Sequence, residues 1–208
     1  MLKHLGKIKF IGDLSMEDAD ILTKYAKQSI NILEFGVGGS TQILSQCLPQ
    51  RLISVDTVET GGDKWIAVTR DRINKLEHKT NPEFFDLFDF LPNIPKISFD
   101  LIFVDGVWWQ RRPFADATWP LLAVGGVILF HDTRRKIDSD NAIDFAKEYF
   151  EEISNVELNA VASNGKSSNT TVIHKKIKEP YVNWNNTENK PAWAYGDPSY
   201  TGDLVSWQ

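Results

Sequence analysis

Short apolar runs alternate with amphipathic segments along most of the chain. Residues 31–35, 51–56, 100–104 and 127–130 are apolar almost throughout, which predicts buried strands, and weaker strand patterns cover 83–86, 156–162 and 170–175. Between them, apolar residues at helical spacing predict helices over 15–28, 41–48, 63–77, 113–122 and 142–153. Ser15 is placed to cap the first helix, and Pro113 suits the first turn of another.

This alternation predicts a Rossmann-like, three-layer α/β/α sandwich over residues 1–177. Strands that are apolar on both faces and alternate with helices form mostly parallel sheets with helices on both sides. The last two strands are joined by the turn 163–166 without a helix, so we expect one antiparallel strand in a sheet of seven.

The segment 178–208 differs in composition from the rest. It is rich in Asn, Pro and Gly and carries Trp184, Trp193, Tyr195, Tyr200 and Trp207, which is too aromatic for ordinary disorder. We therefore predict a C-terminal arm that packs on the domain or on a partner subunit in a homo-oligomer.

A glycine-rich turn follows the first predicted inner strand and opens a helix. Its sequence is Glu34-Phe35-Gly36-Val37-Gly38-Gly39-Ser40-Thr41, and Asp56 ends the next strand twenty residues after Gly36. Glycines allow close approach of the backbone to a ligand, and an acid at this distance can bind a ribose diol. Thr41 stands where a dinucleotide fingerprint has its third glycine, and the acid Glu34 suits a ligand with an amino group, so S-adenosylmethionine is favoured over NAD.

The motifs ILEFGVGGST, LISVD, FDLIFVDG and LLAVGGVILFHDT follow one another in a recognisable order. The chain resembles class I S-adenosylmethionine-dependent methyltransferases over residues 14–175. It is most similar to the small O-methyltransferase-like group with a His-Asp pair after the fifth strand. The resemblance implies that Glu34, Gly36, Gly38 and Ser40 line the methionine end of the cofactor, that Asp56 binds the ribose, and that Asp86 lies beside the adenine.

A second candidate site combines Asp105 with His131 and Asp132. Each follows a predicted buried strand, so these side chains should meet at the carboxyl edge of the sheet, where open α/β sheets bind ligands. In metal-dependent relatives an acid at the Asp105 position and an acid–amide pair after the fifth strand hold a divalent cation. Here His131 and Asp132 replace that pair.

Three interpretations of this trio stay open. One imidazole and two carboxylates can hold Mg²⁺, Mn²⁺ or Zn²⁺. His131 can instead act as general base towards an acceptor hydroxyl, or the residues can simply cap the next segment. Asp105 can also contact the cofactor. The adjacent Trp108 and Trp109 form either a wall of the acceptor pocket or part of the core, and their place just past the ligand edge favours the pocket wall.

Composition and charge narrow the function class. The net charge of -5 gives no field that would attract nucleic acid or an anionic membrane, and the pairs Arg111-Arg112 and Arg134-Arg135 are interpreted as solvated surface. No apolar run is long enough to span a bilayer, and the single cysteine, Cys47, cannot form an internal disulfide, so we expect a cytoplasmic protein.

We therefore expect methyl transfer from S-adenosylmethionine to a small-molecule acceptor, at a hydroxyl oxygen. Three alternatives stay open: a metal-dependent enzyme with hydroxylase-like chemistry on the same fold, a non-catalytic cofactor-binding protein, and an NAD-dependent oxidoreductase. The sequence does not name the acceptor, because fold alone does not fix function.

Overall fold

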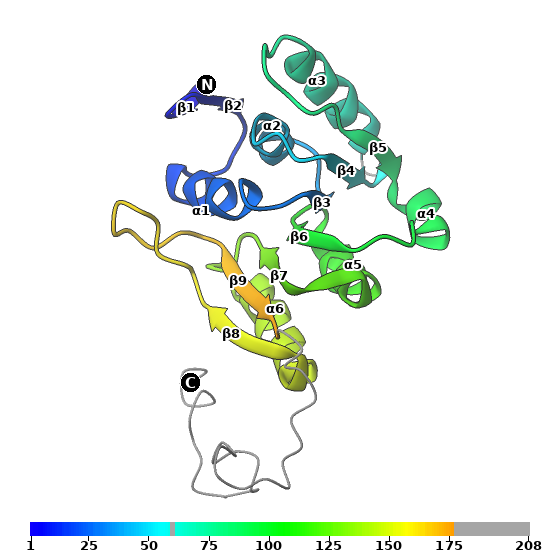
Figure 1. Ribbon diagram of the computed structural model, residues 1–208, viewed down its shortest axis with the longest axis vertical. Coiled ribbons are helices and arrows are strands. Elements are labelled where there is room, and N and C mark those ends of the chain that lie inside the picture. The colour runs from blue at the N-terminus through cyan, green and yellow to red at the C-terminus, as the bar shows by residue number, and fades with distance from the viewer. Residues whose placement is uncertain (59–60, 177–208) are drawn as a thin grey trace, which may run out of the picture. The chain divides into compact units, whose positions relative to one another are not determined.

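The computed structural model describes residues 1–58 and 61–176 (Figure 1). The segment 178–208, for which the sequence predicts an aromatic arm, lies outside the described residues, so the arm stays a prediction. None of the helices in the described part is long and apolar enough to cross a membrane.

A seven-stranded sheet organises residues 1–176, in the order β5-β4-β3-β6-β7-β9-β8. Its strands are β3 (Asn31–Phe35), β4 (Arg51–Asp56), β5 (Glu83–Asp86), β6 (Phe99–Val104), β7 (Leu122–Phe130), β8 (Ile153–Glu157) and β9 (Thr171–Lys175). The pairs formed among β3 to β7 are parallel, whereas β9 is antiparallel to both β7 and β8. The predicted mostly parallel sheet with one antiparallel strand is confirmed.

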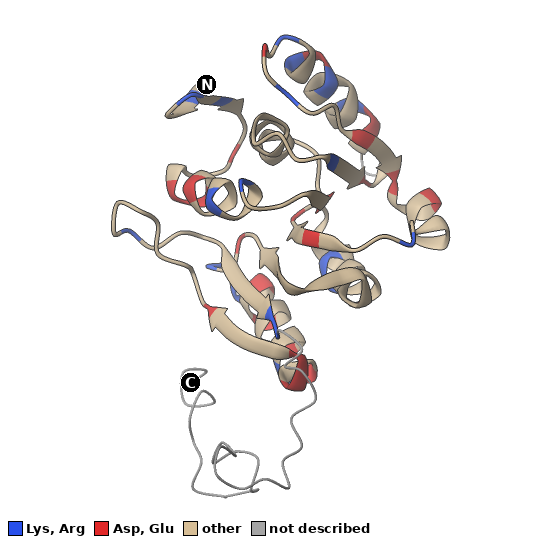
Figure 2. Ribbon diagram, viewed as in Figure 1, with Lys and Arg blue, Asp and Glu red and all other residues tan. Residues whose placement is uncertain are grey.

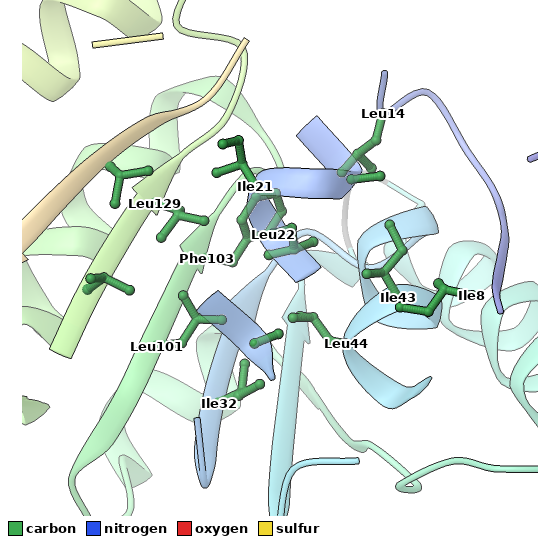
Figure 3. Close-up of a cluster of buried hydrophobic side chains, with 14 of the residues drawn as sticks. Ile8, Leu14, Ile21, Leu22, Ile32, Ile43, Leu44, Leu101, Phe103 and Leu129 are labelled. Atoms are coloured by element: carbon green, nitrogen blue, oxygen red, sulfur yellow. The ribbon is translucent and has the colours of Figure 1, made fainter. Parts of the chain in front are cut away.

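Helices cover both faces of the sheet. They are α1 (Met16–Ala26), α2 (Gly39–Gln46), α3 (Gly62–Asn74), α4 (Leu87–Phe90), α5 (Trp108–Thr118) and α6 (Lys136–Glu148). On one face, Ile21 and Leu22 of α1 and Leu44 of α2 are buried against sheet residues such as Leu101 and Phe103 (Figure 3). On the other face, Phe35 of β3 stacks on Phe114 of α5 with ring centroids 4.8 Å apart. Charged residues concentrate on the helices and at strand ends (Figure 2).

An N-terminal hairpin was not predicted from the sequence. Its strands β1 (Leu2–Leu5) and β2 (Ile8–Ile11) pair antiparallel, and Gly6 between them has a positive φ of 59°. Two glutamines of α2 hold β2: the side-chain amides of Gln42 and Gln46 each donate to and accept from its backbone, at Ile11 and Lys9. This pairing satisfies backbone groups of an edge strand with side chains, which hydrophobic periodicity cannot reveal.

Some element boundaries also differ from the sequence prediction. Helix α5 begins at Trp108, so Pro113 lies inside it rather than in its first turn. Buried packing of Phe114 and Ala115 outweighs the hydrogen bond that the proline removes. Strand β8 ends at Glu157 rather than at 162, because Asn159 adopts a left-handed φ of 45° that interrupts the extended chain.

Candidate functional site

Two adjoining cavities lie at the carboxyl edge of the parallel strands. The first, the cofactor cleft, has a volume of about 480 Å³ and is lined by the glycine turn 36–40, Asp56, the start of α3 and residues 11–14. The second, the polar pocket, has a volume of about 500 Å³. Asp13, Asp105 and His131 line both cavities and so mark their junction.

The glycine turn is shaped by close backbone contacts. Gly36 has a positive φ of 101°, and a Cβ there would lie 2.2 Å from the amide nitrogen of Gly106, so this position requires glycine. A Cβ on Gly38 would meet no protein atom within 4 Å. The turn is thus packed against the protein on one side and open to the cleft on the other.

Asp56 ties the glycine turn to the next strand. One carboxylate oxygen accepts from the Val37 N–H at 2.9 Å and the other from the Thr57 N–H at 2.7 Å. Burial raises the pKa of Asp56, and the nearby charges of Asp105 and Asp86 add to the effect. Each oxygen keeps a second lone pair for a ligand in the cleft, whose wall Asp56 forms.

Glu34 lies beneath the turn and not in the cleft. Its side chain is fully buried and accepts a 2.7 Å hydrogen bond from the Ser54 hydroxyl. Burial raises the pKa of Glu34 to about 7, although hydrogen bonds from Ser40, Ser54 and Thr41 oppose the shift. The Ser40 hydroxyl likewise points back into the turn, towards the Gly36 carbonyl at 3.4 Å.

The Asp86 side chain holds the backbone of two nearby segments. Its carboxylate accepts from the Phe88 N–H, which caps α4, and from the Val58 N–H at 2.8 Å. It is not among the described residues that line the cofactor cleft.

The outer wall of the cleft is formed by two segments that the sequence did not single out. The Gly12 segment crosses the start of α2 so closely that a Cβ on Gly12 would lie 2.8 Å from the Cα of Gly39. On α3, Trp65 is 54% exposed and lines the cleft. Arg72, two turns further along α3, also lines it and donates to the Ile11 carbonyl at 3.3 Å.

The described residues that line the polar pocket include no aliphatic side chain and no aromatic one besides the imidazole of His131. Its acids are Asp13, Glu17, Asp18, Asp105 and Asp132. Its basic groups are His131, Arg134 and Arg135, and its neutral groups are Ser15, Ser167, Ser168 and Asn169. These residues come from α1, from the ends of β6 and β7, and from the hairpin before β9.

A buried arginine holds the acids behind this pocket. The Arg111 guanidinium, only 4% exposed as a residue, pairs with Asp105 at 2.6 Å, Asp132 at 3.2 Å and Asp138 at 2.9 Å. Arg135 adds a second cation, 2.6 Å from Asp132. The interpretation of Arg111 as solvated surface is therefore wrong: the fold turns this side chain inward from α5.

His131 is almost enclosed by carboxylates. Its Nδ1 lies 3.3 Å from Asp105 and 3.5 Å from Asp132, and its Nε2 lies 3.6 Å from Asp18, although neither nitrogen forms a well-aligned hydrogen bond. Burial by itself disfavours the charged ring, but Asp105, Asp18 and Asp132 outweigh it and raise the pKa of His131 to about 10. The ring is thus an imidazolium at neutral pH.

Asp18 is a partner of His131 that the sequence patterns did not single out. It does complete the capping box with Ser15, and it also accepts from the Asn169 N–H at 2.7 Å and the Thr170 hydroxyl at 2.8 Å. Burial would raise the pKa of Asp18, but these bonds and the charge of His131 lower it well below its usual range. One residue therefore starts α1, anchors the hairpin before β9 and faces the imidazole.

The trio Asp105, His131 and Asp132 converges as its position after two neighbouring strands predicted. One ligand atom from each lies within 4.8 Å of the others. Asp132 adopts a left-handed φ of 62°, a strained conformation of the kind that clusters at functional sites. Its Oδ1 accepts from the Asn169 amide at 3.0 Å, and its Oδ2 faces Arg111 and Arg135.

Trp108 and Trp109 do not form the expected pocket wall. They contact each other edge to face at the start of α5, remain half exposed, and are not among the described residues that line either cavity. Val107, just before them, is the residue that reaches the cofactor cleft.

Comparisons with known proteins add to this geometry. The model of a methyltransferase domain family matches residues 33–133. No curated protein matches the chain. Among solved structures, the chain is similar to an O-methyltransferase from Bacillus cereus in complex with S-adenosylhomocysteine, with 22% identity, a TM-score of 0.59, and coverage of 78% of this chain and 83% of that one.

Two further structures have the same fold. An O-methyltransferase from Streptomyces achromogenes involved in tomaymycin synthesis, in complex with S-adenosylmethionine, is 17% identical at a TM-score of 0.57, over 79% of this chain and 82% of that one. A methyltransferase from Podospora anserina bound to S-adenosylhomocysteine is also 17% identical, at a TM-score of 0.55, over 78% of this chain and 79% of that one. The described chain thus has the Rossmann-like fold of these methyltransferases, and its residues 33–133 match a methyltransferase domain.

Proposed function

We propose that the protein is an S-adenosylmethionine-dependent methyltransferase that acts on a hydroxyl of a small molecule. The observation that carries the proposal is the junction of the two cavities. A glycine-turn cleft with an acid at the next strand end opens directly into a pocket of polar side chains, through Asp13, Asp105 and His131. The cofactor complexes among the similar structures support the same donor.

The cofactor cleft offers a partner for each part of S-adenosylmethionine. The first turn of α2, at Gly39 and Ser40, presents N–H groups without helical partners to the methionine carboxylate. Asp56 binds the ribose hydroxyls, and Trp65 offers its indole face to the adenine. Glu34, buried beneath the glycine turn, holds that turn in place. Asp86 lies close to the adenine end and is given no direct contact with the cofactor.

Transfer is an in-line displacement in which the protein mainly positions donor and acceptor. The acceptor oxygen bonds to the methyl carbon, the carbon–sulfur bond breaks with its electron pair left on sulfur, and the hydroxyl proton passes to a carboxylate at the junction. The His131 imidazolium, held by Asp105 and Asp132, places a fixed positive charge beside the acceptor oxygen and stabilises its developing negative charge. In this state His131 is a charge stabiliser and becomes a base only after losing its proton.

A divalent cation is a second candidate for the same position. The orphaned His131 Nδ1, with one oxygen each of Asp105 and Asp132 within 3.5 Å, is a donor set that fits Mg²⁺, Mn²⁺ or Zn²⁺. The opposite oxygens are held by Arg111, as partners behind metal ligands commonly are. When bound, the ion supplies a Lewis acid to the acceptor hydroxyl in place of the imidazolium proton.

Calorimetry with S-adenosylmethionine, S-adenosylhomocysteine and NAD tests the cofactor. The first two are expected to bind and NAD is not; binding of NAD alone would instead support an oxidoreductase. Binding of the cofactor without methyl transfer to any acceptor would support a non-catalytic protein.

His131→Ala tests the chemistry. It is expected to lower turnover by roughly 10²–10³ while cofactor affinity is kept, because the fixed charge beside the reacting oxygen is lost. Loss of activity with chelator, restored by Mg²⁺ or Mn²⁺, together with proton release on Mn²⁺ titration, would identify the metal form. Normal turnover of the variant, with no effect of chelator, would leave the trio a structural role only.

A further inference from the structure

The side chains that line the polar pocket indicate which class of methyl acceptor it suits. Small-molecule sites are usually lined mostly by apolar and aromatic side chains, with a few polar groups. Here, each of the described residues that line the pocket has a side chain that is charged or carries a hydroxyl, amide or imidazole group. Among the described residues, no aliphatic or aromatic hydrocarbon side chain lines the pocket to stack on a flat phenolic ring, and Trp108 and Trp109 lie outside the lining.

We propose that the polar pocket binds the methyl acceptor and that this acceptor is a neutral, polyhydroxylated molecule of the sugar class. The proposal rests on the methyltransferase function proposed above and names its substrate class. A sugar hydroxyl is both donor and acceptor, so one ligand can use carboxylates and basic groups together.

The distribution of charge in the pocket favours a neutral ligand. Three charged residues of the lining come from two parts of the chain. Asp13 precedes α1 and Glu17 lies in its first turn, whereas Arg134 follows β7. The two acids would repel an anionic acceptor, and Arg134 would repel a cationic one. Hydroxyl groups can form hydrogen bonds with the acids and with the arginine. Arg134 forms no ion pair with the described residues; one guanidinium nitrogen donates to the Ser167 carbonyl at 2.6 Å, which leaves its other N–H groups for a ligand.

Asp13 is the residue placed to receive the acceptor's proton. It lines both cavities, and within the described part of the chain its carboxylate has neither a hydrogen bond nor an ion pair. The other junction acid, Asp105, is already engaged: one of its oxygens pairs with Arg111 at 2.6 Å and the other faces His131 at 3.3 Å. The sugar hydroxyl therefore gives its proton to Asp13 as its oxygen takes the methyl group.

The experiment measures transfer of a tritiated methyl group from S-adenosylmethionine by the full-length protein. One acceptor panel holds methyl glycosides of hexoses and deoxyhexoses, and the other holds catechols and hydroxycinnamates. Methyl transfer to glycosides and none to phenols is expected. Transfer to a phenol, or to neither panel while calorimetry shows cofactor binding, overturns the sugar proposal; absence of cofactor binding overturns the methyltransferase function itself.

A pair of variants tests the role of Asp13. Asp13→Asn is expected to lower kcat for the accepted glycoside by roughly 10²–10⁴ with little change in its KM, because the amide accepts a hydrogen bond but not the proton. Asp20→Asn is the matched control, since Asp20 also lies on the α1 side but accepts from the Ser163 N–H and lines neither cavity. Equal turnover of the two variants would show that Asp13 is not the proton acceptor.

Discussion

The cofactor cleft and the polar pocket lie side by side but are built in different ways. The cleft depends on backbone: glycines at a strand–helix turn, helix N–H groups and one carboxylate, Asp56, that holds two backbone amides. The polar pocket depends on side chains from distant parts of the chain, held together by ion pairs around Arg111 and His131. Local sequence therefore defines most of the first site, whereas long-range packing completes the second site around the predicted trio Asp105, His131 and Asp132.

The largest effect that separates the two regions concerns Arg111. Arg111→Met removes the cation that three acids share and leaves uncompensated buried charge, so the free energy of unfolding should fall by about 3–5 kcal/mol. Arg112→Met is the matched control: Arg112 pairs with Asp116 and Glu148 near the surface, and its loss should cost about 0–1 kcal/mol. Urea unfolding of both variants measures the difference, and equal costs would mean that the Arg111 cluster does not organise the pocket.

A second prediction concerns stability against pH at Glu34. Its pKa is raised from 4.5 to about 7 in the folded protein, so the folded state holds the proton more tightly than the unfolded state. The stabilisation is complete below pH 4.5 and is lost as the pH rises through about 7, a change of about 3 kcal/mol.

Glu34→Gln tests this prediction because glutamine does not titrate. Its free energy of unfolding should lack the decline between pH 4.5 and about 7. Glu83→Gln is the control, since Glu83 pairs with Arg51 near the surface and its pKa is lowered by that partner. Identical pH profiles of Glu34→Gln and the unmodified protein would contradict the buried, protonated state.

A third prediction compares two acids at neighbouring strand ends. Asp56→Asn should weaken binding of S-adenosylmethionine by about 1.5–3 kcal/mol, or roughly 10–150-fold, because charge-assisted bonds to the ribose are lost. Asp86→Asn should leave the affinity within about twofold, since its carboxylate is engaged by the Val58 and Phe88 amides. Calorimetry gives both values, and a larger loss at Asp86 would place the adenine against that residue.

The smallest expected effect is at Trp65. Stacking on an aromatic face contributes about 0.5–1.5 kcal/mol, so Trp65→Ala should weaken cofactor binding by roughly 2–12-fold. Trp109→Ala should not change it, although Trp109 is 47% exposed against 54% for Trp65, because it does not line the cleft. A similar change in both variants would rule out specific stacking at Trp65.

Much of the fold was predictable because it depends on local patterns. The apolar strands and amphipathic helices set the parallel sheet, and the glycine turn with Asp56 marked the cleft at its carboxyl edge. The hairpin Leu2–Ile11 was missed because its strands are only four residues long, although Ile8 and Phe10 of the second strand alternate with Lys9 and are buried in the core. Helix α5 was placed too late because Pro113 gave a local signal that tertiary packing overrode.

The sequence by itself determined the alternation of apolar strands with helices, the glycine turn and the meeting of Asp105 with His131 and Asp132, because each follows from strand position and residue type. Only the tertiary structure decided that Arg111 is buried, that Asp18 faces His131, and that Asp13 lies at the junction with no partner among the described residues. Ion pairs join residues far apart in the chain and have no period. From the sequence alone a charged residue is predicted to be solvated, because the ion-pair partners that allow its burial are brought to it only by the fold.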